Sequence, residues 1–479
     1  MKLTVLGILV LPLSLIWALR PLRLVQIALV AAVFEAGAAL VIGGGFGLPL
    51  AMVPGLLFIA YIIMQYALGM RYAAEGPVLR AVIPLLALLF YALLSVLLLP
   101  DAFAGTVMVW PQKADPIQPG LVPLAFNSGN VTQTLYLAMN ITITVATALF
   151  LTHSKVSYRG IICAYLLGGY VVVGLAFWQF ASRIAGVPFL DDVLYSNPGW
   201  AIVEQNLGGV PRIQASFSEP AGLAFYLSGL CFCCLWLIAR RYRVMAPSLL
   251  LVLAVVAMLL STSTTGIVTL LLGLPLLTVL TGLRSDASGL AQLMKTVAVL
   301  ALSGAIAIGP VFVLKPSLLQ SVDQVVTSTL SKGDSESYTE RSGIDAAAVA
   351  TVGASYGLGV GWGSFRASSL LPGLLANGGV FGVLMVLWLF ARVARLVSKA
   401  AANAPEHSGR VLVDGFSAAL CGQLCAALLS APTIGSLAFF LQLGCVIGAA
   451  ARMSVEPSSA AVAGQQISIV TPRGNVAAA

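Results

Sequence analysis

The chain has 479 residues, of which 59% are hydrophobic and only 9% are charged, and its mean hydropathy is +0.99. One soluble core could not bury this much apolar surface, so the composition excludes a soluble globular protein and favours an integral membrane protein. The net charge of +8 reflects mainly how lysine and arginine are divided among the loops, and it does not indicate nucleic-acid binding.

Thirteen long apolar runs predict transmembrane helices, because a helix needs roughly 20 apolar residues to cross a bilayer. The runs are continuous, whereas the strands of a membrane β-barrel alternate polar and apolar residues. We therefore expect an all-α polytopic membrane protein with about 12–14 transmembrane helices. The first run is interpreted as a span and not a signal peptide, because no small-x-small cleavage site follows it. In chain order the runs cover residues 3–19, 24–43, 48–69, 81–99, 131–152, 160–181, 220–239, 246–261, 265–283, 296–314, 369–391, 411–431 and 433–451.

Lysine and arginine are distributed unevenly among the connecting segments. The segments that follow odd-numbered runs hold 17 of the 25 basic residues, and short cytoplasmic loops are enriched in such residues. This pattern predicts that those segments are cytoplasmic and that the N-terminus is outside. Residues 1–452 would then form a single transmembrane domain, and the small and polar residues 453–479 a disordered cytoplasmic tail.

Three segments on the opposite side are longer than hairpins: residues 100–130, 182–219 and 315–368. The first is rich in turn-forming residues, which indicates a structural loop. The other two carry charged and aromatic residues typical of a surface at the membrane interface. We expect these two larger extracytoplasmic loops to roof a cavity that opens to the outside.

The residue types needed for most hydrolytic and metal chemistry are scarce in the outer segments. Both histidines, His153 and His407, fall on the predicted cytoplasmic side. Neither a Ser-His-Asp triad nor a set of metal ligands is therefore expected outside, and no Walker-type phosphate loop is present. We expect no metal and no cofactor.

Arginine is what the outer segments offer instead. Its planar and permanently charged guanidinium binds phosphate or carboxylate at two points. Arg212, Arg341 and Arg366 could therefore clamp an anion such as a lipid phosphate. The alternative is that each arginine snorkels at the membrane interface or pairs with an acidic residue.

Glu219 has two interpretations. It precedes Pro220 at the start of an apolar run, where an acidic residue stabilises the positive end of a helix dipole and Ser216 or Ser218 can cap the helix. It could also orient Arg212 or accept a proton from an attacking hydroxyl group.

Two short motifs are typical of turns. STSTTG, residues 261–266, suits a tight hairpin, or else a polar lining that faces an acceptor. GLGVGWG, residues 357–363, suits a glycine turn, although the N–H groups of such a run can also bind phosphate.

Four stretches, in this order, resemble the O-antigen ligase and polysaccharide polymerase superfamily of bacterial envelopes: RIQASFSEPAG, LLSTSTTGIVTLLLG, ERSGIDAAAVATVGASYGLGVGWGSF and SSLLPGLLANGGVFGVLMVLW. The features that carry the resemblance are an arginine ahead of an SEP helix start, an S-x-S-x-T-G hairpin, and an arginine ahead of GxGxG. Together they cover about residues 160–450.

Members of this family join a sugar chain carried on undecaprenyl diphosphate to an acceptor hydroxyl group, using a large extracytoplasmic loop and neither metal nor nucleotide. The resemblance implies that Arg212 and Arg341 hold the diphosphate, that Arg366 and Ser218 also contact substrate, and that Glu219 assists the hydroxyl group. It further implies a bacterial inner membrane, with the active site facing the periplasm.

Two departures from the family pattern favour its polymerase branch. The late loop lacks the histidine that ligases typically show ahead of the span beginning SSLLPGLL, and Thr264 stands where an arginine is often found. The expected activity is polymerisation of lipid-linked repeat units into an O-antigen or exopolysaccharide chain. A ligase that transfers finished glycan to lipid A core or protein, and an exporter or flippase of lipid-linked or anionic sugars, are the alternatives. Expected partners are the lipid-linked glycan, membrane lipids, a chain-length regulator and a flippase, and no nucleic acid.

Overall fold

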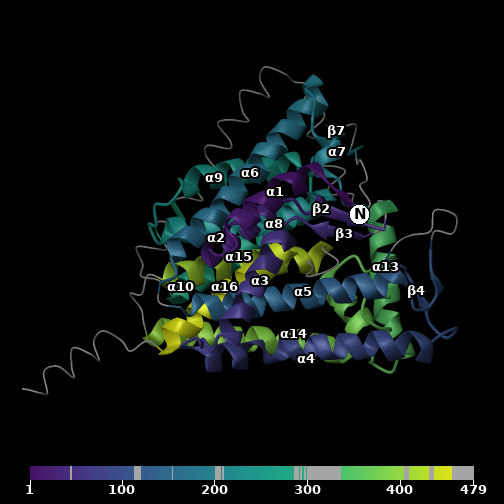
Figure 1. The fold of residues 1–479 in the computed structure, drawn as a ribbon. Helices are drawn as coiled ribbons and strands as arrows, with labels where there is room; N and C mark the ends of the chain where they lie inside the picture. Colours follow the sequence, from purple (N-terminus) through teal and green to yellow (C-terminus); the bar gives the residue numbers. More distant parts are fainter. Residues whose placement is uncertain are drawn as a thin grey trace, which may run out of the picture.

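Long helices that run side by side make up most of the structure (Figure 1). This computed structural model describes residues 1–43, 46–112, 120–153, 155–199, 206–207, 210–284, 291, 294–295, 298, 336–403, 409–430 and 436–455. The predicted all-α fold class is confirmed. Nearly all of the predicted span 296–314, and the predicted tail beyond residue 455, lie outside the described residues.

Seven helices of the described part of the chain are long and apolar enough to cross a membrane, which confirms a polytopic helical membrane protein. They are α4 (Glu75–Ala102), α5 (Ser128–Leu151), α6 (Tyr158–Ala185), α8 (Pro220–Ala239), α14 (Leu370–Asn403), α15 (Gly409–Ser430) and α16 (Leu437–Val455). The other helices are α1 (Val5–Ile16), α2 (Pro21–Ala31), α3 (Met52–Ala67), α7 (Asp191–Leu194), α9 (Pro247–Leu260), α10 (Thr264–Arg284) and α13 (Glu336–Ala354).

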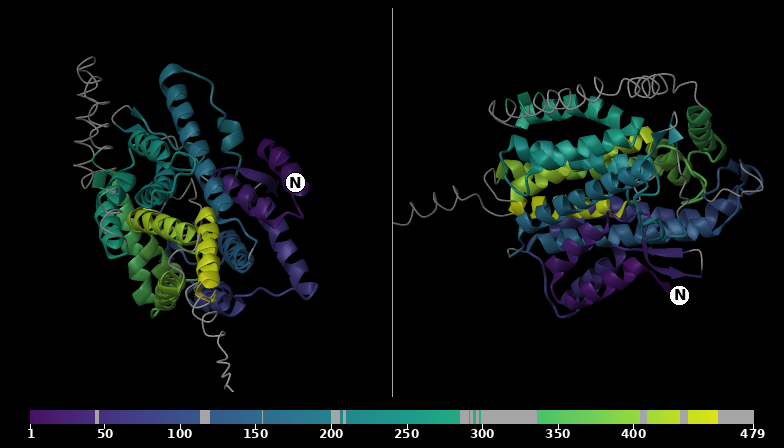
Figure 2. Two further views of the ribbon diagram at one scale, coloured as in Figure 1. Left: turned by 90° about the vertical axis from the view of Figure 1, so that its left-hand side faces the viewer. Right: turned by 90° about the horizontal axis from the view of Figure 1, so that it is seen from above.

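Segments predicted to share one side of the membrane contact one another at one end of the bundle. On the predicted cytoplasmic side, Arg392 Nη1 donates to the Arg80 carbonyl (2.8 Å), Arg240 Nη2 lies 3.4 Å from Asp414 Oδ2, and Arg452 Nη1 donates to the His153 carbonyl (3.2 Å). Among the predicted outer segments, Arg366 N donates to the Trp110 carbonyl at 2.8 Å. We call the end that holds Arg366 the outer end; α13 lies there, to the right in Figure 1 and in the right-hand view of Figure 2.

One predicted span is wrong. The apolar run 24–43 predicts a single helix, but α2 ends at Ala31 and, after a turn, the chain continues as the strand β2 (Ala38–Ile42). β2 pairs antiparallel with β1 (Lys2–Leu3) and β3 (Phe46–Pro49). Apolarity alone does not separate a strand from a helix, and the glycines that follow β2 suit a hairpin. Residues 32–37 are therefore a turn and not part of a membrane-spanning helix.

Two short two-residue pairings complete the strands of the described residues outside this sheet. β4 (Met108–Val109) pairs with β5 (Val122–Pro123), and β6 (Asn206–Leu207) pairs with β7 (Val210–Pro211). Both hairpins belong to predicted outer loops, so these loops carry local structure. The predicted loop 315–368 likewise contains the helix α13.

Helices α8 and α16 lie at the centre of the bundle. In the most apolar 18-residue stretch of each helix, 94% of the residues of α8 and 89% of those of α16 are buried. In α4, which faces outward, the share is 39%. α16 approaches α5 closely because it presents glycines four residues apart. A Cβ atom at Gly444 would lie 2.7 Å from the Thr144 carbonyl oxygen, and one at Gly448 would lie 2.3 Å from that of Ala148. Close packing of small residues thus fixes α16 against α5.

Candidate functional site

The segment that carries Arg212 and Glu219 is held in a fixed shape by the end of α6. Oε1 of Gln179 accepts hydrogen bonds from Gln214 N and Ala215 N, both at 2.8 Å. Ala215 has a φ of 52°, so the chain turns sharply there. α8 then begins with a proline, which is tolerated at the first helical position because no N–H is needed. Arg212 and Glu219 therefore lie on either side of a rigid turn.

The structure brings Arg212 and Arg341 together from loops that are far apart in the sequence. Arg212 Nε donates to the carbonyl of Ser261 (3.4 Å), in the STSTTG hairpin, and Arg341 Nη1 donates to Ser430 Oγ (2.6 Å) at the end of α15. Burial and the positive charge of Arg341 lower the pKa of Arg212 to about 10, and Glu219 opposes this shift. Two cations held close together in a half-buried position form a site that favours an anion.

Glu219 and Arg366 form an ion pair at the same place. Glu219 Oε1 lies 4.0 Å from Arg366 Nη2, and the two side chains are 37% and 49% exposed, so water weakens their attraction. The predicted serine cap of α8 is not found, because Ser216 Oγ donates to the Val33 carbonyl and Glu219 makes no side-chain capping bond. Ser218, predicted to contact substrate, is only 6% exposed.

A further carboxylate, Glu35, lies next to these residues, although no sequence feature singled it out. It occupies the turn between α2 and β2, inside the run that predicted a span. Glu35 Oε2 lies 3.5 Å from the position that a Cβ atom would take at Gly222, in the first turn of α8. Burial, and to a smaller extent the charge of Glu219, raise the pKa of Glu35 to about 7. We call Arg212, Arg341, Arg366, Glu219 and Glu35 the outer charge cluster.

Glu35 faces a pocket between the α2 turn, α3, α5 and the start of α16. The polar side chains of the pocket wall are Glu35, Tyr136, Asn140 and Ser436. Tyr136 is fixed by its hydroxyl group, which donates to the Gly47 carbonyl at 2.9 Å. Glu35 is therefore the acidic side chain of a small, mainly apolar pocket beside the cluster, in which Tyr136, Asn140 and Ser436 are the other polar side chains.

The glycine motif 357–363 builds structure and does not offer a phosphate site. Gly357, Gly359, Gly361 and Gly363 all have positive φ values between 78° and 99°, so the chain can thread between α4, α5 and α14. Most N–H groups of this stretch donate within the protein: Val360 N donates to the Ala376 carbonyl, Gly359 N to Ser355 Oγ and Trp362 N to Ser95 Oγ. The turn interpretation of this motif is supported.

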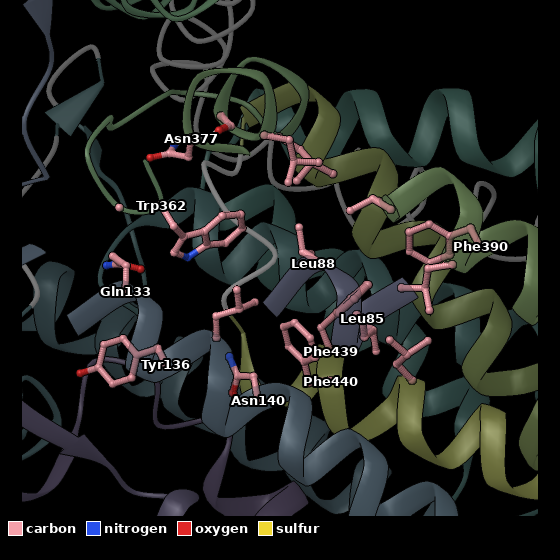
Figure 3. A pocket seen from close by; sticks show the side chains of 18 of the residues that line it. Leu85, Leu88, Gln133, Tyr136, Asn140, Trp362, Asn377, Phe390, Phe439 and Phe440 are labelled. Carbon is pink, nitrogen blue, oxygen red and sulfur yellow. Dashed lines mark hydrogen bonds between the residues drawn. The ribbon is translucent and has the colours of Figure 1, made fainter. Parts of the chain in front are cut away.

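The same stretch forms the wall of a second, mainly apolar cavity between α4, α5, α14 and α16 (Figure 3). Including its opening, the cavity measures about 800 Å³. Figure 3 shows Gln133 and Tyr136 on one side of it and Leu85 and Phe390 on the other. The polar side chains of the lining are those of Gln112, Gln133, Tyr136, Asn140 and Asn377. None of the three arginines of the outer charge cluster is among the residues that line it.

The loop that lines the cavity at Trp362 and Gly363 continues to Arg366 of the outer charge cluster. Arg366, which pairs with Glu219, follows Gly363 by three residues, and Gln112 Nε2 donates to the intervening Phe365 carbonyl at 2.9 Å. Tyr136 and Asn140 line both this cavity and the Glu35 pocket. An apolar space and a cationic site are thus neighbours at the outer end.

Comparisons with known proteins do not assign this site. No model of a known protein family matches the chain, and no curated protein matches it. The family resemblance in the loop motifs stays a prediction. What the chain does must be inferred from the outer charge cluster and the cavity beside it.

Proposed function

We propose that the protein is a membrane glycosyltransferase that joins undecaprenyl-diphosphate-linked repeat units into an O-antigen or exopolysaccharide chain on the outer side of a bacterial inner membrane. The observation that supports this most is the convergence of Arg212 and Arg341 in a half-buried position. Charged residues make up only 9% of the chain, and two neighbouring cations repel each other unless an anion lies between them. A lipid diphosphate would be such an anion.

The chemistry asked of such a site is modest. The anomeric carbon of the donor sugar is already activated by its diphosphate, so the protein must align donor and acceptor and stabilise charge that grows on the leaving diphosphate. Arginine suits this task because its guanidinium binds phosphate oxygens at two points and stays charged. Even with its pKa lowered to about 10, Arg212 is a cation at neutral pH.

The apolar cavity supports a lipid-linked donor over a soluble one. It is lined largely by leucine and phenylalanine, including Leu85, Phe439 and Phe440, and can accept part of an isoprenoid chain. Its other side, at Trp362 and Gly363, adjoins the loop that carries Arg366. A molecule with an apolar tail and a diphosphate head would match both halves of this arrangement.

The proposal can be tested by supplying the purified protein with lipid-diphosphate-linked repeat units and separating the products by size. Wild type is expected to give a ladder of longer glycans without ATP or added metal. Arg212→Ala and Arg341→Ala are each expected to lower the rate by about 100-fold or more, the scale of losing one charge-stabilising group. Arg183→Ala is the matched control, because Arg183 is an outer arginine that pairs with Asp191 at 3.8 Å.

Two other results would replace the proposal. A single transfer of glycan to lipid A core or protein, with no ladder, would indicate the ligase activity. Movement of the intact lipid-linked unit across vesicles, with no new glycosidic bond, would indicate a flippase or exporter. Equal rates in Arg212→Ala, Arg341→Ala and the Arg183→Ala control would remove the arginine clamp from the mechanism.

A further inference from the structure

The turn that carries Glu35 is fastened to the outer loop. Ala36 N donates to the Ser216 carbonyl (3.1 Å), Ser216 Oγ donates to the Val33 carbonyl (2.6 Å), and Asn197 N donates to the Ala36 carbonyl (3.1 Å). These three bonds surround Glu35 on both sides in the sequence. The backbone on both sides of Glu35 is therefore fixed, and its carboxylate lies next to Gly222 in the first turn of α8.

The pocket that Glu35 faces is linked to the cationic site through the start of α8. Glu35 lies against the first turn of α8, which directly follows Glu219. The charge of Glu219 acts on both Glu35 and Arg212. The pocket and the cationic site are thus neighbouring parts of one outer region.

We propose that Glu35 is the catalytic base of this site, the group that accepts the proton of the acceptor hydroxyl group when the new glycosidic bond forms. This inference rests on the proposed function. It assigns the Glu35 pocket to the sugar acceptor, whose hydroxyl groups suit the polar side chains of Tyr136, Asn140 and Ser436. In this scheme the arginines of the outer charge cluster bind the donor diphosphate.

Glu219 is the less suitable base. Its carboxylate faces Arg366 at 4.0 Å, so it is oriented toward a cation and away from the Glu35 pocket lining, to which it does not belong. Glu35 has the opposite setting, since burial and the nearby charge of Glu219 raise its pKa to about 7. Among the residues that line its pocket, Tyr136 is the other titratable group. A base with a pKa near the working pH is the most effective one.

In the proposed step, the acceptor oxygen bonds to the anomeric carbon of the donor sugar, and the bond between that carbon and the diphosphate oxygen breaks. The diphosphate leaves with the electron pair, while the hydroxyl proton passes to the carboxylate of Glu35. Glu219 acts in this scheme as a positioning residue, because it holds Arg366 and faces Arg212.

The test is a pH profile of elongation by wild type, Glu35→Gln and Glu35→Asp, with Asp101→Asn as the control. Asp101 is an exposed carboxylate at the outer end of α4. The wild-type rate is expected to fall tenfold per pH unit below about pH 7. Glu35→Gln should be at least about 100-fold slower at pH 8, Glu35→Asp should keep a measurable rate with a shifted midpoint, and the control should follow wild type.

Binding of inorganic pyrophosphate, measured as a thermal shift, shows that each variant is folded and that its arginine site is intact. A Glu35→Gln protein that binds pyrophosphate and elongates with the wild-type rate and pH profile would overturn the assignment of the base, while the glycosyltransferase proposal would stand. If Glu35→Gln does not fold, an unchanged profile in Glu35→Asp would overturn it equally. A wild-type protein that never elongates the lipid-linked unit would overturn both proposals.

Discussion

Replacing Glu35 by glutamine is expected to stabilise the protein at pH 8 and to leave its stability unchanged at pH 4. The reason is that the folded protein keeps the Glu35 carboxyl partly buried and close to Glu219, where the ionised form is disfavoured. Glutamine has nearly the same shape but never ionises. The substitution therefore removes a cost that exists only when Glu35 is charged.

The direction and the size of this stability change follow from the pKa values of Glu35 in the unfolded and the folded protein. The ordinary pKa of this carboxyl is 4.5, and in the folded protein it is about 7. Between these values the folded state binds more protons than the unfolded state, so the free energy of unfolding of wild type falls as the pH rises. The full difference corresponds to about 3 kcal/mol. The advantage of Glu35→Gln should grow from near zero below pH 4.5 to about this value above pH 7.

The measurement is the melting temperature of both proteins in detergent from pH 4 to pH 8, followed by the fluorescence of the seven tryptophans. A difference of about 3 kcal/mol is expected to separate the two curves by roughly 3–6 °C at pH 8. Asp101→Asn, which removes an exposed carboxylate, should run parallel to wild type at every pH. A constant separation between Glu35→Gln and wild type across this range would refute the raised pKa.

Three substitutions test the framework of the site by thermal or denaturant unfolding. Gly359→Ala should lower the free energy of unfolding by about 2 kcal/mol or more, because Gly359 has a φ of 82° and its Cβ would lie 2.6 Å from a backbone nitrogen of α14. Gly353→Ala is the control: a Cβ there meets open space on α13, so this variant should be neutral or slightly stabilising. Asp345→Ala should cost about 1–2 kcal/mol, because this carboxylate accepts two backbone N–H bonds at the start of α14; an unchanged stability would contradict that capping role. Asp414→Asn should cost about 2–3 kcal/mol by removing the counter-ion that Arg240 and Arg410 share. A smaller loss in a variant that also lacks Arg240 would confirm that pairing.

Much of the fold could be predicted from the sequence because bilayer physics leaves few choices. A continuous apolar run must satisfy its backbone internally, so the runs at 131–152 and 220–239 became α5 and α8 with ends within a few residues of those expected. The run 24–43 failed because its length met the rule for a span while its second half pairs as a strand with β1 and β3. Pairing partners distant in the chain are not visible in local hydropathy.

The candidate site was only partly predictable for a related reason. Arg212, Arg341 and Arg366 stood out because charge is rare and was easy to locate in the outer loops. That Arg212 and Arg341 converge depends on Ser261 and Ser430, at the ends of α9 and α15. Ser261 opens the STSTTG motif, whose composition indicates a turn and not an arginine partner, and Ser430 belongs to no motif. Glu35 was not predicted. Its one sequence signal is that it is a lone carboxyl inside the apolar run 24–43.

The charges of the outer cluster also predict how donor binding and proton transfer depend on each other. Three arginines and two carboxylates give the cluster a formal charge of +1, which becomes +2 when Glu35 is protonated. A sugar-linked diphosphate carries about two negative charges and gains about one more as it leaves, so a proton accepted by Glu35 offsets the charge that develops on the leaving group. The same coupling means that pyrophosphate should bind Glu35→Gln more tightly than wild type above pH 7, by roughly 1 kcal/mol, and equally well below pH 5. Titration calorimetry on the two proteins at each pH cancels the ionisation of the ligand itself, and identical affinities at pH 8 would mean that Glu35 and the arginines do not share one electrostatic site.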